Sequence, residues 1–191
     1  MKVAEFVRIR FRGIRILTNS ATNTSVPRHP NSHEFGYKQT GMLPYPKTVV
    51  VRHSKENPRK CTILPLRGRD DILFLSYPVA KPPALDGYIR LAAEGPPLTL
   101  ADKDKGILLL DGSWRWAGAM TRDFADLPPR SLQGYRTAYP RVSKQGTDPD
   151  NGLASVEALY LAYHILQRPT EGLLDAYHWA EEFLGLNGLR S

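Results

Sequence analysis

The stretch LLLDGSWRWAGAM, residues 108–120, decides the fold prediction. A continuous run of leucines is typical of a strand that is buried on both faces of a parallel sheet. The run ends abruptly in aspartate, glycine, serine and two tryptophans, and residues of this kind at the end of a buried strand commonly line a cleft. The stretch therefore predicts a strand that delivers a functional loop, followed by a helix over residues 115–124.

Apolar runs elsewhere predict further strands. Residues 47–53 and 71–78 are two of them, the second one buried and closed by proline. Residues 131–140 are a less regular strand candidate, and residues 85–94 are predicted to form a short helix. Because strands alternate with helices along the chain, the predicted fold class is α/β.

Two helices are predicted at the end of the chain. In ASVEALYLAYHIL, residues 154–166, apolar residues recur at helical spacing, and Ser155 is expected to cap the first turn. Pro169 ends this helix. Thr170 is expected to cap a second helix, whose apolar positions follow it.

The composition is that of an ordinary soluble protein. The chain has 191 residues, of which 41% are hydrophobic and 24% are charged. No apolar stretch approaches the ~20 residues that a membrane span requires, so we expect no membrane partner. The single cysteine, Cys61, excludes an internal disulfide and favours a reducing, cytoplasmic location. The five histidines are dispersed, so we also expect no metal site.

Positive charge is concentrated in the first third of the chain. Residues 1–69 contain 14 Lys and Arg against 3 acidic residues, a net charge of +11, whereas residues 70–191 carry −4. A one-sided basic field attracts a phosphate backbone, although solvated charges kept for solubility fit the same count. In VRIRFRGIRIL, residues 7–17, arginines alternate with apolar residues, which predicts a strand with one basic face. Residues 18–46 are expected to be loop.

Three predicted strand ends carry unusual loops: PRKCT at residues 58–62, LSYP at residues 75–78 and DGSWRWA at residues 111–117. The carboxyl ends of parallel strands form the ligand crevice of an open α/β sheet, so these loops are expected to line one pocket. Their apolar, hydroxyl and carboxylate groups suit a flat heteroaromatic ligand such as adenine. The alternative, in which the two tryptophans fill a core and the aspartate caps the following helix, stays open. Phosphate-loop, dinucleotide-binding, nucleophile-elbow and zinc-protease motifs are absent from the sequence.

Five short motifs resemble, in order, those of the small-subunit rRNA aminocarboxypropyltransferases, a family that uses S-adenosylmethionine (SAM) and has a SPOUT-like fold. That family shows a D-P-K-x-C-[TS] loop, an L-S-P strand end, a D-C-S-W motif, a K-L-S-x-x-E-A helix start and a closing helix of the type F-x-W-G-x-x-F-x-x-x-N. The resemblance extends over residues 48–187. The matching motifs in this chain are NPRKCT, LSYP, LDGSWRWA, GLASVEA and YHWAEEFLGLN.

Two departures from the family pattern concern the choice of RNA. Gly112 stands where the family has a cysteine, which brings D-G-S-W closer to the D-G-T-W motif of the tRNA-uridine aminocarboxypropyltransferases. The family's N-P-V-N-Y-G loop is replaced by residues 134–152, GYRTAYPRVSKQGTDPDNG.

The resemblance implies a division of the chain. A mixed α/β N-terminal part would precede a SPOUT-like, trefoil-knotted C-terminal domain. Residues 1–46 would form a basic N-terminal extension that is partly loop, residues 47–105 an α/β RNA-binding part, and residues 106–191 the SAM-binding domain.

Carried over residue by residue, the resemblance implies a SAM site. Thr62 would bind the aminocarboxypropyl arm of SAM, and Asp111 is a candidate catalytic proton acceptor. Leu75, Pro78 and Trp114 would wall the adenine, Ala117 would pack against the amino-acid side, and backbone groups at Leu110, Gln133 and Leu153 would hold the adenine edge and the ribose. RNA binding is expected to fall to the basic first third of the chain, where the candidate residues are Arg8, Arg10, Arg12, Arg52, Lys55, Arg59 and Lys60.

The implied reaction is transfer of the 3-amino-3-carboxypropyl group to ring nitrogen 3 of a uridine or pseudouridine in small-subunit rRNA. Methylthioadenosine is released, and the role is rRNA processing in ribosome biogenesis, with rRNA or a pre-ribosomal subunit as partner. Three alternatives stay open: a tRNA-uridine aminocarboxypropyltransferase, a SPOUT-type RNA methyltransferase, and a non-catalytic RNA-binding ribosome assembly factor.

Overall fold

The structure is a computed structural model that describes residues 43–140 and 152–190. These residues belong to one compact unit. The strand predicted for residues 7–17 and nearly all of the predicted N-terminal extension lie outside the described residues. Within the described residues, no helix is long and apolar enough to cross a membrane.

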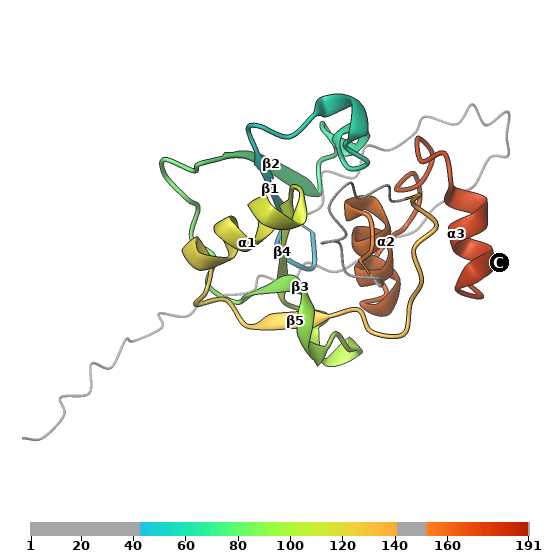
Figure 1. The fold of residues 1–191 in the computed structure, drawn as a ribbon. Helices are drawn as coiled ribbons and strands as arrows, with labels where there is room; N and C mark the ends of the chain where they lie inside the picture. Colours follow the sequence, from blue (N-terminus) through green and yellow to red (C-terminus); the bar gives the residue numbers. More distant parts are fainter. Residues whose placement is uncertain (1–42, 141–151, 191) are drawn as a thin grey trace, which may run out of the picture. The chain divides into compact units, whose positions relative to one another are not determined.

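A five-stranded, all-parallel sheet forms the centre of the fold (Figure 1). Its strands lie in the order β2-β1-β4-β3-β5, so β1 and β4 are central. All strands run in one direction, and their carboxyl ends therefore lie along the same edge. The strands are β1 (Thr48–His53), β2 (Ile72–Tyr77), β3 (Tyr88–Pro97), β4 (Gly106–Asp111) and β5 (Pro129–Ser131).

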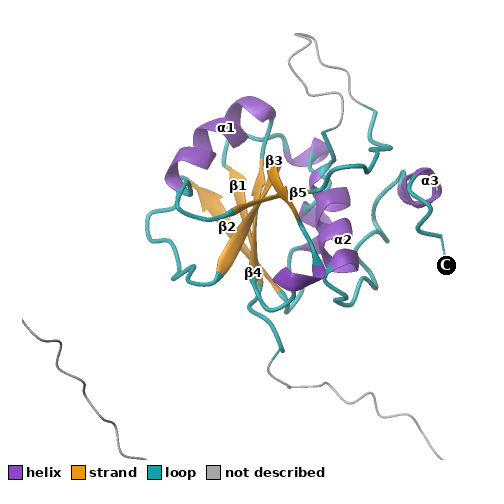
Figure 2. Cartoon of the chain, turned by 90° about the horizontal axis from the view of Figure 1, so that it is seen from below, coloured by secondary structure: helices purple, strands orange, loops and turns teal. Residues whose placement is uncertain are grey.

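Helices cover both faces of the sheet, with α1 on one face and α2 on the other (Figure 2). The alternation of side chains along the central strands supplies two apolar layers. Val49, Val51 and Leu108 face the α1 side, whereas Val50 and Leu109 face the α2 side. The helices are α1 (Trp114–Asp123), α2 (Ser155–Ile165) and α3 (Ala180–Leu186), and the 3-10 turns are η1 (Pro58–Lys60), η2 (Leu64–Leu66) and η3 (Leu100–Asp102).

The α/β class, the three apolar strands and the helix after the leucine run are confirmed. The prediction that β2 is buried was wrong: only Ile72 of its residues is buried, and Leu73 is 39% exposed. The reason is its place in the sheet. Among the strands that the structure describes, β2 is an edge strand that pairs with β1 alone.

The helix predicted over residues 85–94 was also wrong, because β3 begins at Tyr88 and takes up the rest of this segment. Ile89 and Leu91 are separated by one residue and are both buried, which is the period of a strand. Pairing with β4 on one side and β5 on the other fixes the extended conformation. The strand predicted for residues 131–140 was wrong except for Ser131, the last residue of β5.

Neither predicted helix cap was right. Ala154 precedes α2, and its backbone N–H donates to Glu157 Oε2 at 2.7 Å, so a glutamate in the first turn satisfies the helix start. Ser155 is instead the first helical residue. Thr170 is followed by turns, and α3 begins at Ala180.

The predicted division at residue 105 runs through a single sheet, because β3 and β4 lie on either side of it and pair with each other. The implied knot and the separate roles of the two parts stay predictions.

Two buried tyrosines make the fold sensitive to alkaline pH. The Tyr163 hydroxyl lies 3.0 Å from Thr48 Oγ1 and 3.1 Å from Asp71 Oδ2, and the Tyr177 hydroxyl donates to Glu157 Oε1 at 2.8 Å. Burial raises the pKa of both tyrosines above the usual 10.0, and the nearby Glu157 raises that of Tyr177 further. The folded protein therefore holds both phenolic protons more tightly than the unfolded chain does.

A group whose pKa is raised on folding contributes stability that is complete below its unfolded pKa and is lost as pH rises above it. We expect the free energy of unfolding to fall above pH ~10 by about 1.4 kcal/mol per pH unit for each tyrosine. In Tyr163→Phe, the free energy of unfolding should fall less steeply with pH, by the contribution of one tyrosine. Urea unfolding at several alkaline pH values measures this slope. Leu159→Ala, which deletes a fully buried side chain of α2, should lower stability at every pH without changing the slope. An unchanged slope in Tyr163→Phe would contradict the prediction.

Candidate functional site

Two of the three loops singled out in the sequence meet at the carboxyl edge of the sheet, and the third begins on the neighbouring strand. Arg52, near the end of β1, is in register with Asp111 of β4 on one side and Ser76 of β2 on the other. The loop after β1 contacts the end of β4, because the Cys61 thiol donates to Asp111 Oδ2 at 3.1 Å. The same loop contacts the start of α1 through Glu56, which accepts from the Ser113 N–H at 2.6 Å.

Half-buried apolar residues lie beside this junction on the α1 side. Leu75 and Leu110 are both in register with Val51, one on each side of it, and both pack on the apolar cluster beneath α1. Pro78 follows β2 directly and is exposed, and Ala117 is half-buried in the first turn of α1. Trp114 is the first residue of α1. The predicted adenine wall thus draws its residues from the end of β2 and from the helix that follows β4.

The loop after β1 is anchored at both ends. Asn57 accepts from the Arg59 N–H at 3.0 Å and so starts the η1 turn, while Ile63 is fully buried beneath α2. Between these anchors, Thr62 Oγ1 accepts from the Val156 N–H at 3.3 Å. A hydroxyl that accepts one hydrogen bond keeps its own proton to donate. Thr62 is therefore tied to the first turn of α2 and still has a donor available.

Asp111 is buried and holds three side chains. Its Oδ1 accepts from the Ser155 hydroxyl at 2.6 Å, and its Oδ2 accepts from Cys61 and lies 3.4 Å from Arg52 Nε. Burial, and next the Asp111 carboxylate, raise the pKa of the Cys61 thiol, which keeps it protonated as a donor. Arg52 also donates from Nη2 to the Glu56 carbonyl at 2.7 Å.

Two further residues, Leu153 and Gln133, were predicted to hold the cofactor through their backbone groups. Leu153 is half-buried just before α2, and Gln133 is exposed in the turn after β5. The cofactor roles of all these residues stay predictions.

His53 and Trp116 form a stacked pair that fixes α1 against β1. Their ring centroids are 4.2 Å apart with an interplanar angle of 14°, and Lys55 Nζ lies 5.5 Å from the Trp116 ring centroid. His53 Nδ1 accepts from the Lys55 N–H at 3.1 Å, which makes the other ring nitrogen the protonated one in the neutral ring. This contact supports the alternative in which Trp116 is a packing residue.

The predicted RNA-binding residues fall into three groups. Lys55, Arg59 and Lys60 are exposed on the loop after β1, beside the junction. The Arg52 side chain is only 11% exposed and turns inward to Asp111, so its geometry is that of an internal partner, and its RNA contact stays a prediction. Arg8, Arg10 and Arg12 lie outside the described residues.

Comparison with known proteins bears on this arrangement. The chain is 28% identical over 152 residues to the 16S rRNA aminocarboxypropyltransferase of Methanocaldococcus jannaschii, covering 76% of this chain and 85% of that protein. The resemblance to the rRNA aminocarboxypropyltransferases is confirmed. The structure of the SAM-dependent rRNA:acp-transferase Tsr3 from Vulcanisaeta distributa matches with a TM-score of 0.58 and 23% identity, over 75% of this chain and 79% of that one. No family model matches the chain.

The solved aminocarboxypropyltransferase structure supports the mixed α/β fold with its parallel sheet. Sequence reasoning missed four residues that organise the site: Glu56, Cys61, Ser155 and Glu157. A signal for three of them was present, since Cys61 stands in the motif NPRKCT, and Ser155 and Glu157 stand in GLASVEA. Nothing in the sequence singled out Glu56.

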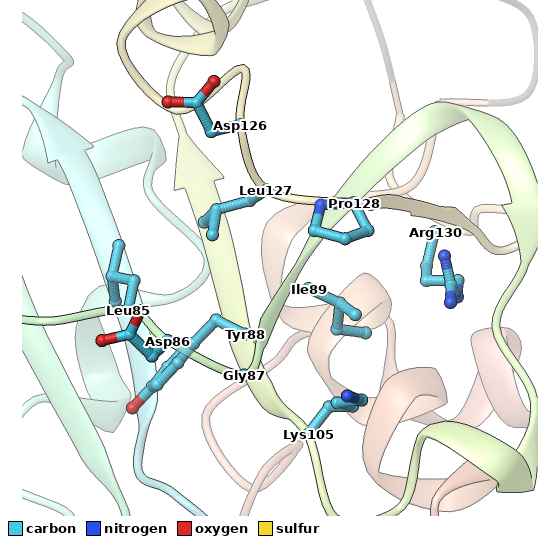
Figure 3. A pocket seen from close by; sticks show the side chains of 10 residues that line it. All are labelled: Leu85, Asp86, Gly87, Tyr88, Ile89, Lys105, Asp126, Leu127, Pro128 and Arg130. Atoms are coloured by element: carbon cyan, nitrogen blue, oxygen red, sulfur yellow. The ribbon is translucent and has the colours of Figure 1, made fainter. Parts of the chain in front are cut away.

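The hollow drawn in Figure 3 is separate from this junction. It has a volume of about 540 Å³ and lies at the amino ends of β3, β4 and β5, the opposite edge of the sheet. Asp86, Asp126, Lys105 and Arg130 give it mixed charge, and Arg130 is already paired with Asp102 at 2.9 Å. We therefore place the candidate site at the carboxyl edge. Among the described residues, no group of three or more His, Cys, Asp or Glu side chains is arranged to hold a metal ion.

Proposed function

We propose that this protein transfers the 3-amino-3-carboxypropyl group of SAM to ring nitrogen 3 of a uridine or pseudouridine in small-subunit rRNA. The observation that carries the proposal is the junction of the Thr62 loop, the end of β4 and the first turn of α2, in a chain similar to rRNA aminocarboxypropyltransferases. The reaction would take place in the cytoplasm, on rRNA or a pre-ribosomal subunit, as a step of ribosome biogenesis. It would need no metal ion.

The residues at the junction fit SAM as the group donor. Leu75 and Leu110 present half-buried apolar side chains on the two strands that flank β1, which suits the adenine ring. Thr62 keeps one hydroxyl proton for the carboxylate of the amino-acid arm, because its oxygen accepts from Val156. Trp114 and Ala117 lie in the first turn of α1 and would complete the wall.

Bound SAM supplies a methylene activated by a sulfonium: nitrogen 3 of the base loses its proton and bonds to this carbon, the carbon–sulfur bond breaks, and methylthioadenosine leaves. The chain's task is to present that methylene, and not the methyl group, in line with nitrogen 3. Thr62 and the α1 residues would set the orientation of the arm. Lys55, Arg59 and Lys60, exposed beside the junction, would hold the phosphates that flank the target nucleotide.

Gly112 does not by itself favour a tRNA substrate. A Cβ atom at this position would lie 3.2 Å from Trp116 Cβ and 3.3 Å from Met120 Cε, a spacing tighter than ordinary contacts. Packing against α1 is therefore one physical reason for glycine in the D-G-S-W motif. The tRNA alternative is left to experiment.

The test uses purified protein, total RNA from cells that lack it, and SAM labelled in the carboxyl carbon. We expect label in the small-subunit rRNA fraction, and Trp114→Ala should lose most of it, whereas the exposed control Asp126→Asn should keep it. Label in tRNA would move the assignment to the tRNA-uridine enzymes, and transfer only from methyl-labelled SAM would indicate a methyltransferase. No transfer together with no SAM binding would leave an RNA-binding assembly factor.

A further inference from the structure

Three separate segments meet on the Asp111 carboxylate. Cys61 comes from the loop after β1, Ser155 is the first residue of α2, and Arg52 lies on β1. Each of them has a donor atom within 3.4 Å of a carboxylate oxygen. Asp111 itself ends β4 and is only 6% exposed.

This arrangement leaves the carboxylate poorly placed to remove a proton from a substrate. A general base must reach the proton it takes, at about 2.6–3.2 Å between heavy atoms. Both Asp111 oxygens are already engaged by donors of the chain. Protonation would also remove the charge that Arg52, whose side chain is 11% exposed, pairs with.

We propose that Asp111 is a positioning residue and not the proton acceptor of the reaction. Its carboxylate holds the Thr62 loop, through Cys61, and the first turn of α2, through Ser155, in the relative places from which Thr62 binds SAM. The direct bond from the Val156 N–H to Thr62 Oγ1 joins the same two segments beside the carboxylate. Cys61 and Ser155 become positioning residues of the site with it. The inference rests on the proposed function, since it assigns a role within the SAM site.

In this assignment the proton on nitrogen 3 passes to solvent. The rate of transfer then rises with pH as the base ionises, in the variant as in the wild type. If a side chain of the protein accepted the proton, its own ionisation would also appear in the pH profile of the transfer rate. Replacing that side chain would remove this ionisation from the profile.

The first experiment compares Asp111→Asn, Cys61→Ala and Ser155→Ala in SAM binding and in single-turnover transfer at saturating SAM. Asparagine keeps the size of the side chain and removes its charge. We expect all three variants to raise the Kd for SAM about tenfold and to keep the single-turnover rate within about threefold, with pH profiles parallel to the wild type. Asp126→Asn, an exposed aspartate at the opposite edge of the sheet, is the matched control.

The opposite pattern would overturn the inference. If Asp111 accepts the proton, Asp111→Asn alone loses about 10²–10⁴ in rate at saturating SAM. Its pH profile would then flatten, while Cys61→Ala and Ser155→Ala would stay close to the wild type.

The second experiment needs no SAM. Hydrogen exchange of the Val156 amide should accelerate about tenfold in Asp111→Asn, whereas the Leu166 amide, bonded to the Ala162 carbonyl at the far end of α2, should be unchanged. Unchanged exchange at Val156 would show that the carboxylate does not hold the two segments. If the wild-type protein binds no SAM, the proposed function is overturned, but the role of Asp111 in holding the junction is not. The hydrogen-exchange result still decides that role.

Discussion

Replacing Glu157 with alanine is expected to destabilise the protein by about 3–5 kcal/mol. The glutamate is fully buried, and its two carboxylate oxygens accept four hydrogen bonds. The donors are the N–H groups of Ala138 and Ala154 and the hydroxyls of Thr137 and Tyr177, at 2.6–2.8 Å. Alanine would leave all four donors without this partner, and two of them, the Ala154 N–H and the Tyr177 hydroxyl, are buried. The free energy of unfolding in urea, followed by tryptophan fluorescence, measures the effect.

The control is Glu181→Ala, which removes an exposed glutamate from the first turn of α3. It should change stability by no more than about 0.5 kcal/mol. A loss below 1 kcal/mol for Glu157→Ala would contradict the assignment of Glu157 as the residue that joins the loop after β5 to α2. Such a result would mean that the four donors find other acceptors when the carboxylate is removed.

How far the fold could be predicted depended on where its stabilising contacts lie along the chain. The apolar runs of β1 and β4 predicted strands, because a strand that is buried on both faces is mostly apolar. β3 was mistaken for a helix because the alanines and glutamate of its second half favour helices locally. Its pairing with β4 and β5 outweighs that preference, and pairing between distant segments leaves no local signal.

The site shows the same division. The three loops could be predicted to share one edge, because parallel strands place their carboxyl ends together. The partner of a charged side chain could not be predicted. Counted by sequence, Arg52 is one of many cations in the first third of the chain, but its register opposite Asp111 turns it inward. Ser155 was expected to cap a helix, and the approach of β4 gives its hydroxyl the Asp111 carboxylate instead.

Reversing two charges beside the junction is expected to weaken RNA binding about 100-fold at ~0.15 M salt. Arg59 and Lys60 are exposed in the η1 turn, three and two residues before Thr62. Replacing both with glutamate would remove two phosphate contacts and add two repulsive charges. The slope of log Kd against log salt concentration should fall by about 2. Binding of small-subunit rRNA fragments, measured by fluorescence anisotropy over a range of salt concentrations, gives both quantities.

The matched control, Lys103→Glu with Lys105→Glu, makes the same change in net charge at the other edge of the sheet. Both lysines are exposed just before β4. A six-residue strand is about 20 Å long, whereas charges are screened over about 8 Å at physiological salt, so the control pair should cost no more than about threefold. Equal losses in the two double variants would mean that RNA responds to the overall charge of the chain and not to the loop beside Thr62. A loss of RNA affinity confined to the Arg59 and Lys60 variant would place the RNA phosphates at the carboxyl edge of the sheet. This is the edge where SAM is proposed to bind, so the target base would lie within reach of the transferred group.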